Sequence, residues 1–433
     1  MLPTMVRVHE FCDASDCFRG VVSVTLAVAM VWAVVVIVVI QCCFALAFAA
    51  IMARRSSVSA TSFHPKAVII LCLRGSDPFL RQCVSSLLSQ DYPDYRLRVL
   101  IDRPDDPSLP IIKEFESNSR LDVSFLDDPP STCSLKCSSL VQAISELDPA
   151  VEVVALCDAD SAPHASWLAE LVAPFSDDQV GVTTGNRWYQ PPPSSPGAVV
   201  RYLWNVPAAI NMILLRIAWG GSLAIRRRVI DEAGLIDKWS NALCEDTMLY
   251  QVLRRHGYRQ VFVPSVLMVN RESSTLSDLM QWIPRQMLTA KLYHPHWLLT
   301  VGYGIISFIV PLLAVGLLMS GWFHADGRVM STAVVLLVAF EFSNVVLVAI
   351  CQWGARQRIV VTDGEENRMG AAFWLTLPFW IVFAQLVTPI YFAKCFLARQ
   401  ISWRGVTYQI RGRTILRETH SPFEERAVDA RSL

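Results

Sequence analysis

The chain has 433 residues, of which 53% are hydrophobic and only 18% are charged, and its mean hydropathy is +0.38. This composition is too apolar for an ordinary soluble protein of this length and indicates a membrane protein. The formal net charge is zero, so no basic surface argues for nucleic acid, and no nucleic-acid partner is expected.

The first predicted element is a membrane segment. After an N-terminal segment, 1–19, residues 20–52 contain no charged side chain, and this run exceeds the roughly 20 residues that a helix needs to cross the hydrocarbon layer. It forms either one long tilted helix or a tight pair. A cleaved signal peptide is the competing interpretation, but the run is too long for the core of a signal. Arg54 and Arg55 follow it, which places the next region in the cytoplasm by the positive-inside rule.

That next region, 60–290, has the length of one large domain. Short apolar runs typical of strands covered on both faces alternate with segments of helical periodicity. This alternation predicts an α/β fold with a doubly wound, mainly parallel sheet, inserted between transmembrane helices. The predicted strands are 66–73, 96–102, 121–126 and 151–157, and the helical segments between them are 74–90, 110–117 and 135–147.

Aspartates follow two of these strands. Asp102 ends one strand, and Asp158 and Asp160 end another directly after a run of apolar residues. Ligands of such sheets bind beyond the carboxyl ends of the strands, and paired carboxylates suit Mg²⁺ or Mn²⁺ bridging a diphosphate. A polar turn at the end of the strand is the plain alternative. No glycine-rich phosphate loop is present, which makes a metal bridge to the phosphates more necessary.

The remaining apolar segments belong to the membrane region. Two helices, near 202–219 and 276–292, are expected in the membrane interface, although a core helix is the alternative for the first. Three segments within 297–397 are each long enough to span. The basic tail, 398–433, should be cytoplasmic like region 60–290. Three full spans between these two regions would instead place them on opposite sides of the membrane. Pro378 and Pro389 make the last segment a candidate for a broken or re-entrant helix, and the parity stays open.

Four segments in order carry a resemblance to a known family: "SLLSQDYPDYRLRVLIDRPDDPS", "LCDADS", "GGSLAIRRRVIDEAGLI" and "CEDTMLY". Together they resemble the family 2 type of inverting glycosyltransferases with a GT-A fold. The bracketing apolar segments and the tail "ISWRGVTYQI" narrow the resemblance to the ceramide glucosyltransferase branch, from about Gly20 to Arg411.

The resemblance implies roles for the nucleotide-sugar site. Asp102 would contact the base or ribose, Lys136 the diphosphate or base, and Asp158 with Asp160 a divalent cation. A turn residue and a solvated lysine are the alternatives for the first two. Gly221, in the segment lining the donor sugar, would let the backbone approach a ligand, while a tight turn before the next helix is the compatible alternative.

Asp246 is predicted to be the general base, because an inverting transfer needs one carboxylate to take the proton of the acceptor hydroxyl. Glu245 is the competing assignment, and an N-cap of the helix that follows is the structural alternative for Asp246. Trp219 lies in the segment near donor and acceptor. Trp188 belongs to an aromatic loop that either stacks on a sugar or fixes the loop to the domain.

One motif departs from the family pattern. The family carries (Q/R)xxRW on an interfacial helix, and here "MQWIPRQML" keeps only Arg285, which still suits a diphosphate. Trp282 stands where Gln or Arg is usual, Gln286 replaces the tryptophan, and Pro284 interrupts the motif. Because of this departure, the motif does not predict an aromatic contact near the acceptor. It therefore does not fix the identity of the lipid or of the sugar.

The predicted function is transfer of one sugar, expected to be glucose, from a UDP-sugar donor to a lipid hydroxyl, such as that of ceramide, with inversion. The partners are the donor, a membrane lipid acceptor and the bilayer of a bacterial cytoplasmic membrane or of the endoplasmic reticulum and Golgi. A processive polysaccharide synthase is the alternative, but it needs more spans and the complete motif. An inactive scaffold or a transporter fits the intact aspartates and the large insert less well.

Overall fold

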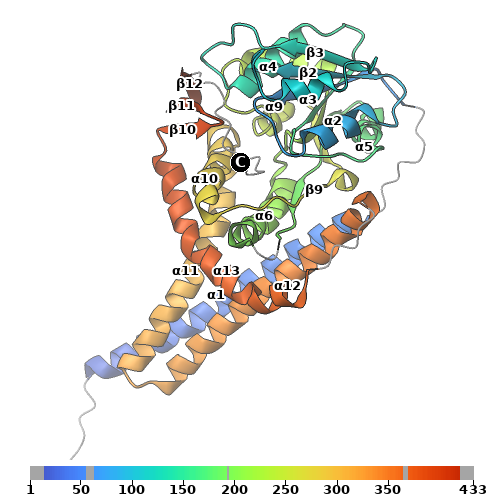
Figure 1. Cartoon of the computed structure of the whole chain (residues 1–433). Coiled ribbons are helices and arrows are strands. Elements are labelled where there is room, and N and C mark those ends of the chain that lie inside the picture. The colour runs from blue at the N-terminus through green and yellow to red at the C-terminus, as the bar shows by residue number, and fades with distance from the viewer. Residues whose placement is uncertain (1–13, 55–62, 193–194, 364–368, 420–433) are drawn as a thin grey trace, which may run out of the picture.

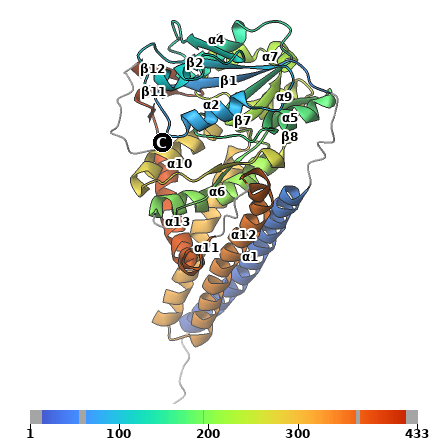
Figure 2. The same cartoon turned by 45° about the vertical axis from the view of Figure 1, so that its right-hand side comes forward.

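The computed structural model describes residues 14–54, 63–192, 195–363 and 369–419. The start of the N-terminal segment, Arg55 and the end of the basic tail lie outside the described residues. An α/β domain sits at one end of a group of long helices (Figures 1 and 2).

The domain is built on a seven-stranded sheet in the order β3-β2-β1-β4-β7-β5-β8. β7 is antiparallel to both of its neighbours, and every other pair is parallel. The predicted fold class, an α/β domain with a mainly parallel sheet, is confirmed. The strands are β1 (Ala67–Leu73), β2 (Tyr95–Ile101), β3 (Leu121–Phe125), β4 (Val153–Cys157), β5 (Val180–Thr184), β7 (Ser222–Arg226) and β8 (Arg259–Phe262).

Both faces of the sheet are covered, as the continuous apolar runs predict. Along β1, Ile69 and Leu71 pack into one core, whereas Val68 and Ile70 pack into the core on the opposite face, because side chains alternate along a strand. Helices of the first face are α2 (Leu80–Leu88), α3 (Leu109–Lys113) and α5 (Trp167–Val172), and those of the second are α4 (Leu135–Ser145), α7 (Arg227–Glu232), α8 (Leu235–Trp239) and α9 (Leu249–Arg255).

The register of the sheet places the ends of several strands at one edge. Leu73 of β1 pairs with Ile101 of β2, so the residues after both strands start level with each other. Cys157, the last residue of β4, pairs with Ser222, the first residue of β7. The antiparallel β7, which the sequence analysis did not predict, therefore brings the segment before Ser222 next to the residues that follow β4.

Two helices separate the sheet from the long helices (Figure 2). They are α6 (Pro196–Leu215) and α10 (Leu276–Tyr293), close to the two interfacial helices expected from the sequence. The short strands β6 (Arg187–Tyr189) and β9 (Met268–Asn270) pair beside them. α10 begins with a capping box, in which the Thr275 side chain accepts from the Asp278 backbone and the Asp278 side chain accepts from the Thr275 backbone, an arrangement that fixes a helix start.

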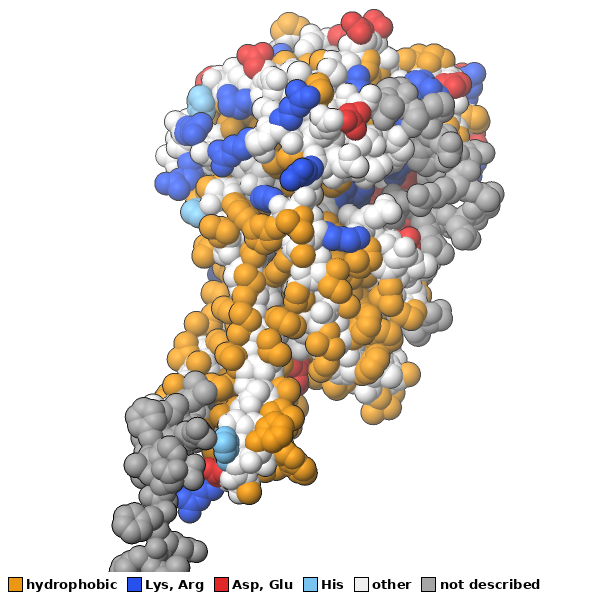
Figure 3. Space-filling view, turned by 90° about the vertical axis from the view of Figure 1, so that its left-hand side faces the viewer, with side chains coloured by type: hydrophobic (Ala, Val, Ile, Leu, Met, Phe, Trp, Pro, Cys, Tyr) orange, Lys and Arg blue, Asp and Glu red, His pale blue; other side chains and the backbone are white. Residues whose placement is uncertain are grey.

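The long helices are α1 (Ala14–Ala53), α11 (Trp297–Phe323), α12 (Gly327–Asp363) and α13 (Ala371–Leu397). The first is one helix and not a pair. Together with α6 they make five helices, within the described residues, that are long and apolar enough to cross a membrane. Apolar side chains cover the long helices, whereas charged side chains gather on the domain (Figure 3). α6 differs from the other four because 56% of its apolar window is buried.

The last long helix, α13, begins and ends on the domain's side. Near its start, Phe373 packs edge-on against Tyr202 of α6, with the ring centroids 5.8 Å apart. Near its end, Phe396 lies 5.5 Å from Trp297, the first residue of α11. At the far end of the bundle, the apolar cluster of described residues comes from α1, α11 and α12 alone. Three helices therefore extend to the far end, and α13 is the re-entrant candidate that Pro378 and Pro389 suggested.

This path returns the chain to the domain. The strands β10 (Gln400–Trp403), β11 (Val406–Arg411) and β12 (Thr414–Thr419) form a small antiparallel sheet after α13. The Leu135 backbone N–H donates to the Tyr408 hydroxyl over 3.3 Å, so this sheet lies against the start of α4. The small sheet and the domain therefore lie on the same side of the long helices.

Candidate active site

A cavity of about 310 Å³ lies beyond the carboxyl ends of β1, β2 and β4. Its other walls come from α6, α10 and the β10–β11 hairpin, so segments far apart in the sequence enclose it. Most of the residues singled out in the sequence line this one cavity: Asp102, Lys136, Asp158, Asp160, Trp219, Glu245, Asp246, Trp282, Arg285 and Gln286.

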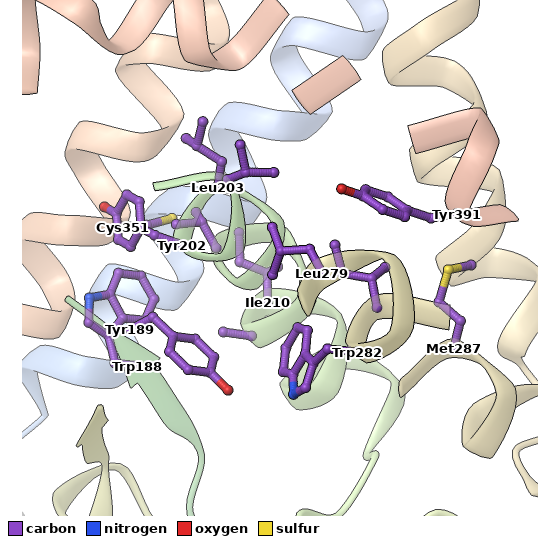
Figure 4. Close-up of a cluster of buried hydrophobic side chains, with 14 of the residues drawn as sticks. Trp188, Tyr189, Tyr202, Leu203, Ile210, Leu279, Trp282, Met287, Cys351 and Tyr391 are labelled. Carbon is purple, nitrogen blue, oxygen red and sulfur yellow. The ribbon is translucent and has the colours of Figure 1, made fainter. Parts of the chain in front are cut away.

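Trp188 and Gly221 do not line it. Trp188 is fully buried, stacks on Phe48 of α1 and donates from Nε1 to Gln352 Oε1 of α12 over 3.1 Å. Figure 4 shows it in the apolar cluster beside Tyr202 and Cys351. In this structure Trp188 packs its loop against α1 and α12, as the second of its two alternatives predicts, and it does not line the cavity.

Gly221 lies directly behind the cavity wall. A Cβ atom on this residue would come within 2.6 Å of Asp158 Oδ2 and 2.2 Å of the Trp219 ring, which real Cβ atoms do not tolerate. The absence of a side chain therefore allows Asp158 and Trp219 to take their positions. In this structure Gly221 supports the site and is not itself a wall of it.

Lys136 links two of the acidic segments. Its Nζ lies 2.8 Å from Asp158 Oδ1 and 2.8 Å from Glu245 Oε1. Burial alone would lower the pKa of Lys136, but these two carboxylates outweigh it and raise the pKa well above its usual value. Burial raises the pKa of Glu245, and Lys136 offsets this effect only in part. Lys136 therefore stays protonated and holds its positive charge in a fixed position beside the end of β4.

Arg187 of β6 contacts both Asp158 and Asp160, the two aspartates that follow β4. Its Nη2 is 2.9 Å from Asp160 Oδ1 and 3.2 Å from Asp158 Oδ2, so both carboxylates already meet at one positive atom. Although burial opposes it, Lys136 and then Arg187 hold the pKa of Asp158 below its usual range.

The described residues contain no group of three or more His, Cys, Asp or Glu that could hold a metal by themselves, so Asp158 and Asp160 would supply only part of the ligands of a cation. Hard carboxylate oxygens that converge on one cationic nitrogen suit Mg²⁺ or Mn²⁺. The donor set fits a divalent ion that takes its other ligands from phosphate and water.

Asp246 is held by backbone groups. Its Oδ2 accepts from the Gly220 N–H over 2.9 Å, and its Oδ1 accepts from the Thr247 N–H over 2.7 Å. Helix α9 begins at Leu249, and its N-cap is Met248, so Asp246 is not the N-cap of that helix. The carboxylate is half-buried, lines the cavity and is oriented without an ion-pair partner of its own among the described residues.

Asp102 follows β2 and is buried beside Arg74, which follows β1, in an ion pair. The level register of the two strands accounts for this contact. Asp102 therefore lines the cavity where β1 and β2 end.

The interfacial helix α10 supplies the opposite wall. Trp282 packs edge-on against Tyr189 and Trp204, with ring centroids 5.7 and 5.5 Å apart, and Tyr189 and Trp282 face each other in Figure 4. Arg285 lies over the ring of Trp403 at 5.2 Å. Burial, and then the neighbouring Arg404, lower the pKa of Arg285 to about 10, so it remains a cation at neutral pH.

Several wall residues had no role in the sequence analysis. Arg74 and Asp77 follow β1, while Trp403, Arg404 and Tyr408 belong to the β10–β11 hairpin. The tail "ISWRGVTYQI" stood out in the sequence as part of the resemblance, but no local pattern connects it with a site some 300 residues earlier.

A second cavity, of about 120 Å³, adjoins the first. It lies among α6, α10, α11, α12 and α13, and its walls are mostly apolar. Among the shared residues, the Thr300 hydroxyl is buried and has no hydrogen-bond partner in the described part of the chain. The residues that line both cavities are Trp204, Ala208, Asn211, Met287 and Thr300.

Comparison with known proteins identifies the family of the chain. The family model described as "Glycosyl transferase family 21" matches residues 30–416. No curated protein matches the chain. Among solved structures, the mannosyltransferase PcManGT from Pyrobaculum calidifontis, in complex with GDP-Man and Mn²⁺, is 15% identical and covers 86% of this chain and 98% of its own, with a TM-score of 0.46.

Two further solved structures are more distant. S. aureus TarS 1-349 is 14% identical, with 83% of this chain and 99% of that chain covered and a TM-score of 0.35. Glucosyl-3-phosphoglycerate synthase from Mycobacterium tuberculosis, in complex with uridine diphosphate, is 16% identical, with 52% and 79% covered and a TM-score of 0.34. The family match, which spans most of the chain, decides the assignment.

Proposed function

Because the chain belongs to glycosyl transferase family 21, we propose that it transfers one sugar, glucose, from a UDP-sugar to the hydroxyl of ceramide or a similar membrane lipid, with inversion. The observation that carries this proposal is the shape of the site. Its cavity has carboxylates and cations at the sheet edge and continues into an apolar cavity among the long helices. Such a site suits a polar donor and an acceptor with a hydrocarbon chain.

The donor would bind at the sheet edge of a GT-A-type domain. Asp102 would contact the nucleoside, and the cations Lys136 and Arg285 would bind the diphosphate. Asp158 and Asp160 would hold a divalent cation. When bound, that ion would neutralise charge on the leaving diphosphate.

The acceptor would enter from the helices. Its chain would occupy the second cavity, and its polar end would pass the buried Thr300 hydroxyl and reach Asp246. Asp246 would remove the hydroxyl proton while the oxygen attacks the anomeric carbon from the side opposite the diphosphate, which inverts the configuration. The backbone bonds from Gly220 and Thr247 would keep the carboxylate directed at the acceptor.

A processive synthase would use the same aspartates. Two features support the lipid reading over this alternative: only three of the long helices extend to the far end of the bundle, and the second cavity has mostly apolar walls. A growing polysaccharide needs a polar channel, because its hydroxyl groups would lose their hydrogen bonds to water in an apolar one. The catalytic domain would face the cytoplasm, where UDP-sugars are available.

Product analysis tests the proposal. Purified full-length protein in lipid nanodiscs would be incubated with Mn²⁺, a membrane lipid extract and labelled UDP-glucose or UDP-galactose, and the products separated by chromatography. We expect one new glycolipid with a single sugar. A labelled water-soluble polymer would establish the synthase, and no transfer with either donor would contradict the assigned chemistry.

Substitution of Asp246 tests the mechanism. Asp246→Asn keeps the shape and one of the two backbone hydrogen-bond acceptors but cannot accept a proton, so kcat should fall about a hundredfold or more, while UDP affinity stays that of the wild type. Asp105→Asn, on an exposed aspartate outside the cavity, is the matched control and should change neither. Retained turnover in Asp246→Asn would transfer the role to another group, with Glu245→Gln as the next variant.

A further inference from the structure

The β10–β11 hairpin reaches into the donor end of the cavity. Its turn residues, Arg404 and Gly405, have left-handed backbone angles, with φ of 46° and 75°. The turn directs Trp403 and Arg404 into the cavity wall. This hairpin follows all the long helices in the chain, yet it lies beside residues that follow β1, the first strand of the domain.

The hairpin is anchored to the segment that carries Lys136. The Leu135 N–H donates to the Tyr408 hydroxyl over 3.3 Å, and the Arg417 N–H of β12 donates to the Ser131 carbonyl over 2.7 Å. Arg417 also donates from its guanidinium to the Pro129 carbonyl over 2.7 Å. These bonds set the position of the turn relative to the start of α4.

The guanidinium of Arg404 is held rigidly. Its Nη2 donates to both carboxylate oxygens of Asp77, over 2.8 and 2.9 Å, and its Nη1 donates to the Arg74 carbonyl over 2.6 Å. In return, Arg74 Nε donates to the Arg404 carbonyl over 2.8 Å. Such fixed geometry favours ligand binding, because little side-chain entropy is left to lose when a ligand arrives.

The hairpin also brings a second guanidinium close to Arg285. Arg285 lies over the ring of Trp403 and makes no hydrogen bond or ion pair with any residue that the structure describes. Arg404 is close enough to lower the pKa of Arg285, and close enough to Asp160 and Asp158 for both to affect its own pKa. Two guanidinium groups therefore line the cavity near the predicted cation site: Arg404 is paired with Asp77, whereas Arg285 has Asp158 nearby but no contact with it.

We propose that the β10–β11 hairpin completes the donor site, with Arg404 binding the diphosphate of a nucleoside diphosphate sugar together with Arg285, and with Trp403 supporting Arg285. An arginine fork gives directed bonds to phosphate oxygens that a point charge does not. This inference deepens the proposed function, since it rests on a nucleotide-sugar donor, and it assigns to a segment after the last helix a direct contact with that donor.

The test compares nucleotides that differ by one phosphate. Kd values for UDP and UMP would be measured in the presence of Mn²⁺ on full-length protein in nanodiscs, without acceptor. Arg404→Ala should weaken UDP binding about tenfold to a hundredfold, the range for loss of a charge-assisted hydrogen bond, and should reduce the preference for UDP over UMP. Arg404→Lys, which keeps the charge but not the fork, should give an intermediate loss.

Arg411→Ala is the matched control, because Arg411 belongs to the same hairpin, is exposed and contacts Gln409. It should leave both Kd values unchanged. Unaltered UDP binding in Arg404→Ala would overturn the role of the hairpin, and so would equal weakening of UDP and UMP. If Arg404→Ala does not fold, Arg404→Lys decides in the same way. Wild-type protein that binds neither UDP nor GDP would instead overturn the donor site itself, which separates the two failures.

Discussion

At the scale of single residues, Asp77 is the carboxylate that holds Arg404 with both of its oxygens. Burial raises its pKa to about 6, and Arg404 offsets this only in part. In the unfolded chain the pKa of an aspartate is about 4. The folded state therefore favours the protonated form, so the contribution of Asp77 to the free energy of unfolding is greatest below about pH 4 and is lost as the pH rises through 6.

Donor binding should depend on pH in the opposite direction, because only the ionised form of Asp77 fixes Arg404 fully. We expect the UDP affinity of the wild type to fall about threefold to tenfold between pH 7 and pH 5, corresponding to the loss of roughly one neutral hydrogen bond. Asp77→Asn should bind UDP more weakly than the wild type at pH 7 and nearly equally at pH 5. Identical pH profiles of the two proteins, measured by isothermal titration calorimetry, would exclude this role of Asp77.

Some residues of the site could be predicted from the sequence and others could not, depending on how far away along the chain their partners lie. Asp102, Asp158 and Asp160 follow apolar runs, so a local pattern places them at the sheet edge. Arg404 meets Asp77 across 327 positions, and no periodicity reports such a contact. Trp188 shows that local sequence can also suggest a contact that the fold does not make. Its neighbours in the sequence suggest a sugar contact, whereas its ring packs on α1.

At the scale of elements, the alternation of helices and strands in the domain was predictable because each element carries its own hydrophobic period. β7 was not predicted, because its short run, Ser222–Arg226, lies between two glycines and a segment with the pattern of a helix. The long helices were also evident from composition, but composition does not say which of them cross. Length alone makes α13 a spanning helix, whereas its contacts return both of its ends to the domain's side.

Labelling of single cysteines tests this path of α13. Gly370 precedes the helix and is exposed, and Gly327 is the exposed first residue of α12, at the turn that follows α11. In sealed vesicles, a membrane-impermeant maleimide should label Gly370→Cys from the same side as Asp105→Cys of the domain, and Gly327→Cys from the other side, with mass spectrometry separating these sites from the native cysteines. Labelling of Gly370→Cys from the side of Gly327→Cys would mean that α13 crosses the membrane.

At the scale of the whole molecule, the two adjoining cavities connect the chemistry of the sheet edge with the apolar helices. Ala384 of α13 lines only the cavity among the helices. A tryptophan there should exclude several methylenes of an acceptor chain, each worth about 0.8 kcal/mol of burial. Ala384→Trp should therefore raise KM for a long-chain acceptor about tenfold or more, without changing UDP affinity or transfer to a short-chain analogue.

Leu386→Trp is the control for that variant, because Leu386 lies two residues further along the same helix and is 60% exposed. It should leave both acceptors unaffected. If long and short acceptors respond equally to Ala384→Trp, the second cavity is not where the hydrocarbon chain lies.

The position of the β10–β11 hairpin has a consequence for biosynthesis. Chains are made from the N-terminus, so the α/β domain leaves the ribosome long before the strands that complete the wall of its cavity. Until α11, α12 and α13 are inserted and the hairpin docks, a nascent chain has its carboxylates but lacks Arg404. Sugar transfer would thus begin only after integration into the bilayer is complete, and partly translated copies would not consume nucleotide sugar.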